Sequence, residues 1–167
     1  MANHIQTNLI VIGNKADVTE FVARVDDGIF PNGELNVFSF DKLIPCPVVD
    51  NRNEWGLANW GCKWSAYGMS AWNINTLDDN HVTAEISYQT PWSPASAFFL
   101  TVSKMFPKLT FKHSFADEGC YFLGSETFQN GEQICVFRPE WNSSEGADLR
   151  CELGLSDEDK FTSDGVV

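Results

Sequence analysis

The sequence NLIVIGNKADVTEFVARV, residues 8–25, decides the fold class of this protein. Residues 8–12 are almost continuously apolar, which is typical of a central strand that is covered on both sides. Gly13 and Asn14 end this run, and Asn14 can cap a following helix. Apolar residues then recur at the helical spacing i, i+3, i+4 and i+7, so we predict a helix with one buried face carrying Val18, Phe21, Val22 and Val25.

Further elements follow at regular intervals along the chain. Residues 66–74 and 81–88 are predicted as two strands of a hairpin, joined by the polar residues 75–80. A second helix is expected to begin at Ser93-Pro94, with the serine hydroxyl as its cap, and to stop at Pro107. Residues 109–115 are expected to form a strand. Asn130-Gly131 is a strong hairpin signal, and the strands flanking it are residues 121–128 and 132–137.

This order of elements predicts the α+β class. Strand, helix, strand, strand, helix, strand is a ferredoxin-like split βαβ arrangement, an antiparallel sheet with two helices on one face, here with an added C-terminal hairpin. Right-handed crossovers place the first strand in the centre of the sheet. We expect a ferredoxin-like domain at residues 1–138. Carboxylates outnumber basic residues in 139–167, which predicts a loosely docked acidic C-terminal extension.

The composition predicts a packed protein of the cytoplasm. The chain has 167 residues, 43% of them hydrophobic, which is enough for one substantial core. Its N-terminus lacks a basic leader, and no apolar run has the length of a membrane span. The five Cys show no C-x-x-C spacing, so we expect reduced thiols and neither a metal site nor a cofactor. The expected location is the cytoplasm of a host cell.

The charge restricts the class of partner. The chain has 11 Lys and Arg residues and 23 Asp and Glu residues, so its net charge is −12. This charge disfavours free nucleic acid as a ligand and favours a partner with a basic protein surface. The alternative is that the acidity only aids solubility. The partner-binding candidates are carboxylates grouped in predicted loops, namely Asp26, Asp27, Asp78, Asp79, Asp117, Glu118, Asp157, Glu158 and Asp159.

Residues 54–64 hold three of the six Trp in a predicted loop rich in Gly and Asn. Trp60 and Trp64, with Lys63 between them, could form an aromatic platform on which a base or sugar stacks. The competing interpretation is that these rings fill the gap between the sheet and the proline-containing segment around Pro45 and Pro47, and we favour it. Trp92 is expected to belong to the same cluster.

The sequence shows no recognisable catalytic arrangement. His113 interrupts an apolar strand and could act as a base near Asp117 or Glu118, but a lone histidine there is more often a satisfied core residue. Cys120 and Cys135 are expected on neighbouring strands without an evident activating base. We therefore predict that the protein is not an enzyme.

Several short motifs resemble a known family. Asn59-Trp60-Gly61-x-Lys63-Trp64, preceded by Leu43-Ile44-Pro45-x-Pro47 and followed by Thr90-Pro91-Trp92-Ser93-Pro94, is similar to the YubB-type ferredoxin-like domain of phage and conjugative-plasmid proteins. The resemblance covers roughly residues 1–135. Members commonly have Thr where this chain has Cys62, and the acidic tail lies outside the family pattern. The resemblance implies the ferredoxin-like fold, an origin in a mobile element and no established enzymatic activity.

These observations lead to two functional expectations. The first is a phage or mobile-element protein that inhibits a host defence complex, such as a CRISPR effector or restriction system, through an acidic and DNA-mimicking surface. The alternative is a nucleic-acid or nucleotide binder that uses the Trp-rich loop. The oligomeric state is left open.

Overall fold

The structure, a computed structural model, describes residues 2–155 of the chain. Within these residues the elements in chain order are β1 (His4–Asn14), α1 (Lys15–Val25), the 3-10 helix η1 (Phe40–Lys42), α2 (Arg52–Asn59), β2 (Asn73–Thr76), β3 (His81–Pro91), α3 (Ser96–Met105), β4 (Thr110–Asp117), β5 (Leu123–Gln129), β6 (Glu132–Phe137) and α4 (Ser144–Glu152). The strands form one antiparallel sheet in the order β2-β3-β1-β4-β5-β6. The predicted ferredoxin-like α+β fold is confirmed.

The first strand lies in the centre of the sheet, as predicted. β1 pairs with β3 from His4↔Pro91 to Asn14↔His81, and with β4 from Ile5↔Asp117 to Ile12↔Thr110. α1 follows directly, because the Asn14 side chain accepts a hydrogen bond from the Asp17 backbone N–H at 2.9 Å. The predicted turn at Asn130 and Gly131 joins β5 to β6, with φ values of 50° and 78° that fit a tight hairpin.

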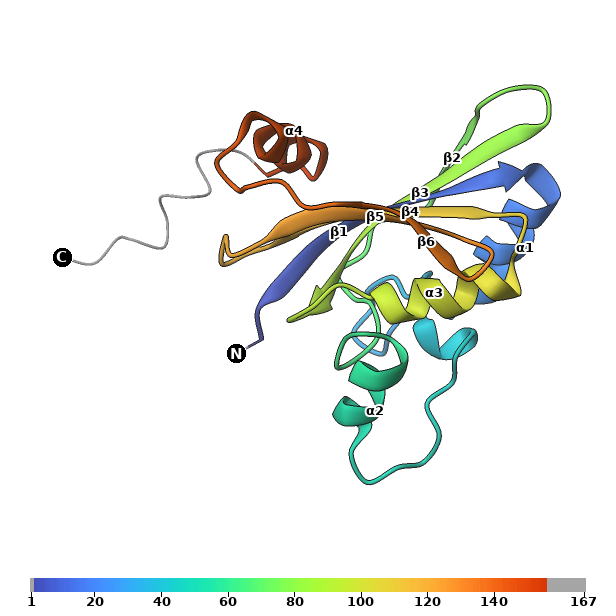
Figure 1. Ribbon diagram of the computed structural model, residues 1–167. Coiled ribbons are helices and arrows are strands. Elements are labelled where there is room, and N and C mark those ends of the chain that lie inside the picture. The colour runs from blue at the N-terminus through green and yellow to red at the C-terminus, as the bar shows by residue number, and fades with distance from the viewer. Residues whose placement is uncertain (1, 156–167) are drawn as a thin grey trace.

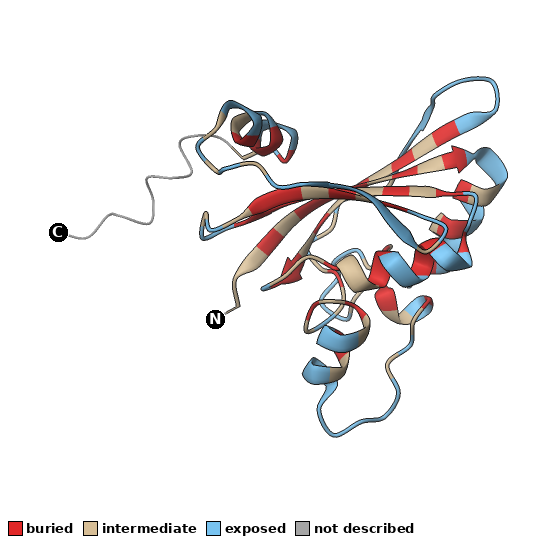
Figure 2. Cartoon of the chain, viewed as in Figure 1, coloured by how far each residue is buried: buried red, intermediate tan, exposed pale blue. Residues whose placement is uncertain are grey.

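The main core lies between the sheet and the helices α1 and α3, which cover one face together with α2 and η1 (Figure 1). Strand β3 alternates as predicted, with its buried residues on this face, and the alternation is visible as red bands in Figure 2. Aromatic rings fill much of the core, and the largest fully buried side chains include Trp60, Tyr88, Phe21, Phe38, Phe40, Phe98, Phe99, Phe111 and Phe128.

Three predicted elements differ from the structure. Residues 66–72 are not a strand, because Trp72 turns into the core, where its Nε1 donates to the Val37 carbonyl at 2.9 Å. Helix α3 begins at Ser96 rather than Ser93, because the Ser93 hydroxyl donates to the Gly61 carbonyl at 2.6 Å and caps no helix. Half of the predicted Trp-rich loop is helix α2, whose N-terminus is capped by the Asn51 side chain.

The start of the acidic extension is more ordered than expected. Helix α4 lies on the opposite face of the sheet from α1 and α3 (Figure 1). Leu149 and Leu153 pack against Ala116 and Leu123 in a second, smaller apolar cluster. A small set of buried contacts therefore holds α4 against the sheet. None of the helices in residues 2–155 has both the length and the apolar character needed to span a membrane.

Candidate functional site

The predicted acidic pairs do not share one face. Asp26 and Asp27 follow the C-terminus of α1, and Asp78 and Asp79 lie in the turn between β2 and β3. Asp117 and Glu118 lie at the opposite end of the sheet, since Asp117 is paired with Ile5 whereas His81 is paired with Asn14. Asp157, Glu158 and Asp159 lie outside the described residues.

The structure does not support the prediction that Asp117 binds a partner. Its side chain is buried, with 1% exposure, and its carboxylate accepts hydrogen bonds from Asn3 Nδ2 at 2.9 Å and from the Tyr121 backbone N–H at 3.3 Å. Because these donors occupy both oxygens, the charge of Asp117 holds the end of the sheet together and is not offered to a partner.

Trp60 does not belong to an exposed aromatic platform, contrary to that prediction. The ring is fully buried, and its Nε1 donates to the Ile44 carbonyl at 3.0 Å. Ile44 belongs to the proline-containing segment, so Trp60 fills the gap between that segment and the sheet, as the competing interpretation predicted. Phe40 and Trp55 contact it edge to face, with ring centroids at 5.9 Å and 5.0 Å.

The remaining platform residues, Lys63 and Trp64, lie at the end of the sheet where β1 begins. One of the predicted acidic residues, Glu118, lies at the same end. We name this the strand-end site, and it consists of His4, Lys63, Trp64, Tyr67, Trp92 and Glu118. Trp64 and Trp92 are 37% and 44% exposed. Lys63 Nζ lies 5.2 Å from the centre of the Trp92 ring, and the Trp64 and Tyr67 rings are 6.5 Å apart. Two exposed indole rings therefore lie at this end of the sheet, and the Lys63 amine lies beside one of them.

Backbone hydrogen bonds at the start of β1 hold Trp92 and Glu118 in place. The Trp92 N–H donates to the Asn3 carbonyl at 2.9 Å, and the Glu118 N–H donates to the His4 carbonyl at 3.1 Å. The Glu118 carboxylate in turn accepts from the His4 backbone N–H at 2.8 Å. Trp92 and Cys120 have φ values of 66° and 63°, which non-glycine residues seldom adopt and which recur at functional sites.

A short hydrogen bond links two further residues of the strand-end site. His4 Nδ1 lies 2.6 Å from the Tyr67 hydroxyl oxygen. Burial of Tyr67 and the nearby Glu118 charge raise the pKa of its hydroxyl to about 12. Tyr67 is therefore a neutral phenol at physiological pH, and it can donate its proton to His4.

The sequence predicted part of the strand-end site. Lys63, Trp64 and Glu118 were among the candidates, and Trp92 was expected to join the same cluster. His4 and Tyr67 were missed because no motif links them. They meet only because Tyr67 bridges to Gln89 on β3, which lies beside the start of β1.

His113 is part of a buried network and not an accessible base. The ring is fully buried, and its Nε2 lies 2.6 Å from Glu126 Oε2, so its partner is Glu126 and not Asp117 or Glu118. Ser96 Oγ donates to the same carboxylate at 2.6 Å, and the Arg138 guanidinium pairs with its other oxygen. Burial lowers the pKa of His113 below its usual range, which favours a neutral ring that donates from Nε2.

The cysteines form no disulfide in the structure. Cys120 lies in the turn before β5 and Cys135 on β6, so they are not on neighbouring strands as predicted. Cys62 is buried, and burial raises the pKa of its thiol to about 12, which leaves it protonated. Among residues 2–155, His, Cys, Asp and Glu side chains form no group of three or more that could hold a metal ion.

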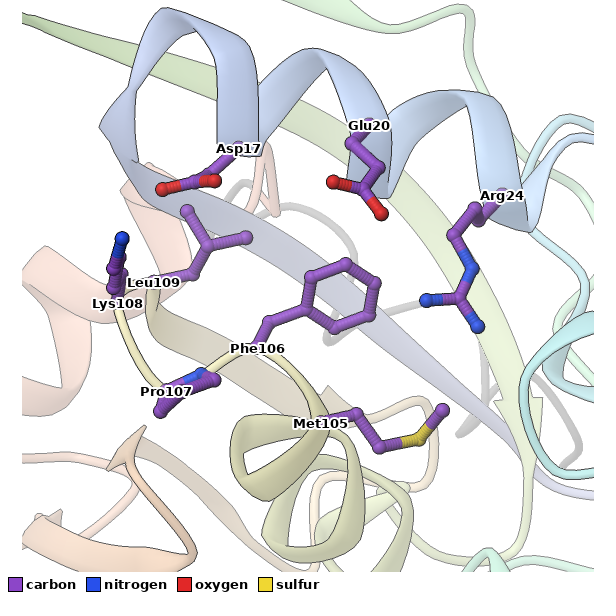
Figure 3. A pocket seen from close by; sticks show the side chains of 8 residues that line it. All are labelled: Asp17, Glu20, Arg24, Met105, Phe106, Pro107, Lys108 and Leu109. Atoms are coloured by element: carbon purple, nitrogen blue, oxygen red, sulfur yellow. The ribbon is translucent and has the colours of Figure 1, made fainter.

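Two surface pockets lie away from the strand-end site. One, of about 190 Å³, lies between α1 and the end of α3 (Figure 3). Its carboxylates Asp17 and Glu20 are balanced by Arg24 and Lys108, and the Arg24 guanidinium lies 5.1 Å from the centre of the Phe106 ring. The other, of about 240 Å³, lies between α4 and the back of the sheet, and it is lined by Lys112, Ser125, Phe137, Glu145, Asp148, Leu149 and Glu152.

Comparison with known proteins assigns the chain to a family. The family described as "Ferredoxin-like domain in Api92-like protein" matches residues 71–160, so the match continues past residue 135 and includes α4. "Uncharacterized protein YubB" of Escherichia coli (strain K12) is 32% identical over 113 residues, which cover 66% of this chain and 72% of YubB.

The crystal structure of a protein api92 from Yersinia pseudotuberculosis is also similar, with 14% sequence identity and a TM-score of 0.43. That similarity covers 68% of this chain and 35% of the Yersinia chain, so about a third of the latter is spanned. From the family match and the likeness to YubB, this chain belongs to the family of ferredoxin-like domains found in Api92-like proteins.

Proposed function

We propose that this protein acts by binding a basic host protein or nucleoprotein complex, of the kind represented by CRISPR effectors and restriction complexes, and inhibits it without catalysing a reaction. The observation that carries the proposal is the strand-end site, where the exposed rings of Trp64 and Trp92 lie at the same end of the sheet as the Glu118 carboxylate, on a chain of net charge −12. Trp and Tyr side chains are the commonest anchors of protein interfaces.

The chemistry of the strand-end site suits the Arg and Lys side chains of a partner. A cation binds over an indole face and pairs with an adjacent carboxylate. Lys63 Nζ already lies over Trp92, so this ring accommodates a cation within the chain itself. The net negative charge adds attraction at long range and speeds encounter with a basic surface.

A continuous DNA-like row of charges is the less favoured form of this proposal. The acidic pairs at Asp78 and at Glu118 lie at opposite ends of the sheet, and Asp117 is buried. The proposal therefore depends on local contacts at the strand-end site, with the remaining carboxylates supplying the long-range field.

The test uses the full chain as bait in cells that carry such defence systems, followed by titration with the purified partner. We expect Trp64→Ala to weaken binding at least about tenfold, as truncation of an anchor residue does, and Glu118→Gln to weaken it less. Leu57→Ala, at an exposed residue of α2, and Asp79→Asn, at the far end of the sheet, are the matched controls.

Affinity should also fall steeply as ionic strength rises. Affinity that stays constant with salt, or controls that lose as much binding as the strand-end variants, would refute this assignment.

A second candidate function is the binding of nucleotides or single-stranded nucleic acid. Trp64 and Trp92 remain exposed, and Lys63 lies beside them, which suits stacking of a base. Stacking should quench Trp fluorescence when a single-stranded oligonucleotide is added, and Trp64→Ala should remove that quenching. Unchanged emission at saturating oligonucleotide would eliminate this candidate.

A further inference from the structure

The exposed edge strand β6 is unlike the rest of the sheet. Every residue of Glu132–Phe137 is exposed, whereas the neighbouring β5 and, beyond it, β4 are largely buried. Three of its side chains are large and apolar, with exposures of 53% for Ile134, 53% for Val136 and 41% for Phe137. In Figure 2 this strand is coloured as exposed along its length.

Edge strands normally carry features that prevent pairing with another chain, and β6 has few of them. It has no proline or lysine between Glu132 and Phe137, and a register shift opposite Thr127 and Phe128 is its one irregularity. The opposite edge strand, β2, is short and mostly polar, with Asn73, Asn75 and Thr76 around a single Ile74. Within residues 2–155, the edge at β2 is therefore protected against pairing with another chain, whereas the edge at β6 is not.

The apolar surface of β6 continues onto helix α3. The Ser96 hydroxyl bonds to Glu126 on β5, and the Ser103 hydroxyl accepts from the Gly131 N–H at the hairpin turn. Leu100 lies between these two serines at helical spacing, so it points toward the same hairpin, and it is 44% exposed. Val136 lies opposite Glu126 in the register and so shares this face of the sheet.

The charges along β6 are balanced, which is unusual in so acidic a chain. Glu132 lies at one end, near the Lys104 side chain that packs against Gly131. Arg138 follows the other end and pairs with Glu126. Two copies of a chain with net charge −12 repel each other over most of their surface. On the α4 side, Glu145, Asp148 and Glu152 line a pocket with Phe137, so the charge balance holds for the strand and its α3 side. Close approach of two copies is therefore less costly along the strand and its α3 side than at an acidic surface.

From these observations we propose that β6 is the interface for a second copy of this chain. The two β6 strands pair antiparallel across a two-fold axis near Cys135, so that the sheet continues from one copy into the other. Antiparallel pairing is self-complementary, because it sets the Glu132 end of each strand against the Arg138 end of its mate. Val136 and Leu100 of the two copies then cover each other.

The size of this surface sets the expected strength. A stable interface buries at least about 1,200 Å² in total, and one pair of short strands with its flanking side chains lies at the low end of that range. The dimer should therefore form and dissociate with protein concentration, and sedimentation velocity over a wide concentration range would measure it without any other protein.

Paired variants at the two sheet edges test the location. Val136→Lys should weaken the dimer at least about tenfold, because it sets two ammonium groups near the axis. Ile74→Lys makes the same change at 50% exposure on the opposite edge and should leave the dimer intact. Circular dichroism confirms that both variants fold.

A chemical readout is independent of these variants. A short bis-maleimide should join two chains through the exposed Cys135, and Cys135→Ser should abolish the linked product, whereas Cys151→Ser, at an exposed thiol on α4, should not. A chain that stays monomeric at the highest concentration overturns the proposal. So does a dimer that Val136→Lys leaves unchanged or that Ile74→Lys weakens equally.

Discussion

At the scale of single residues, Glu126 is a buried charge with three side-chain partners. Its side chain is 4% exposed, yet it bonds to His113, Ser96 and Arg138. Burial alone would raise the pKa of this carboxyl, but its interactions with His113, Ser96 and Arg138 together outweigh burial and lower its pKa from the ordinary 4.5 to about 2. The carboxylate is thus ionised in the folded protein.

We predict that Glu126→Gln destabilises the fold by about 3 kcal/mol at neutral pH, since it leaves a buried network without its charge. Glu85→Gln is the control, because the Glu85 carboxylate accepts from Asn8 on the open face of the sheet. Urea unfolding of the three proteins measures the difference. If both variants lost the same free energy of unfolding, the buried network of Glu126 would contribute no more to stability than the hydrogen bond between Glu85 and Asn8.

The stability contributed by Glu126 should also depend on pH. Its pKa is lower in the folded state than in the unfolded state, so its contribution is complete above the ordinary pKa of 4.5 and is lost as the pH falls toward about 2. The gap in unfolding free energy between the wild type and Glu126→Gln should therefore narrow over this window. A gap that stays constant would contradict an ionised buried carboxylate.

Gly56 provides a second test at the residue scale. A Cβ at this position would lie 2.6 Å from the Lys63 carbonyl oxygen and 2.8 Å from that of Cys62, and backbone atoms cannot move aside as a side chain can. We predict that Gly56→Ala costs about 1–3 kcal/mol despite the better helix propensity of Ala. Thermal unfolding beside Leu57→Ala, an exposed neighbour, checks it. A Gly56→Ala variant as stable as the wild type would mean that this close approach is relaxed in solution.

At the scale of elements, α4 is the least expected part of the fold. The helix is capped by the Ser143 hydroxyl, which accepts from the Gly146 N–H at 3.0 Å, and it is held to the sheet by few apolar residues. An element with so small a buried cluster opens at a lower free energy than the sheet below it.

We predict that Leu149→Ala releases α4 without unfolding the sheet, because this side chain is central to the small cluster. Hydrogen exchange measured by mass spectrometry should show lost protection in residues 144–152 and retained protection in β1. Asp148→Asn, at an exposed position on the same helix, should leave both segments protected. Loss of protection in β1 as well would mean that α4 and the sheet unfold as one unit.

The elements also show where sequence periodicity succeeds. β1, α1, β3 and the β5–β6 hairpin were predicted because each carries a clear local signal, either apolar residues at strand or helix spacing or the Asn130-Gly131 turn. The prediction of a strand at residues 66–72 was wrong. The Trp72 ring packs against Phe21 and Phe38, and this tertiary contact outweighs the strand-like pattern of the local sequence.

At the scale of the whole molecule, the net charge of −12 affects the stability of the fold. Mutual repulsion of carboxylates destabilises a compact state. We predict that the melting temperature rises when sodium chloride increases from about 10 mM to about 150 mM, as the screening length falls from about 30 Å to about 8 Å. Differential scanning fluorimetry measures this shift. A melting temperature that falls with salt would indicate that attractive ion pairs dominate.

The two surfaces proposed for binding lie in different parts of the molecule. The strand-end site combines exposed indoles with Glu118, and β6 offers an apolar strand with balanced charge at an edge of the sheet. We propose the first for a basic partner and the second for a copy of the same chain. Because β6 is one edge of the sheet and the strand-end site is built around the start of the central β1, variants can separate the two activities.

The sequence by itself determined the fold class, the central position of β1, the α1 helix and the final hairpin, because these follow from short-range periodicity, capping and turn chemistry. It also determined the acidic character of the molecule, since net charge needs no coordinates. Only the tertiary structure decided that Trp60 and Asp117 are buried, that His4 and Tyr67 join Trp64 and Glu118, and that β6 is an open edge. These facts depend on contacts between residues far apart in the chain, where burial and register, rather than local pattern, determine which side chains remain exposed.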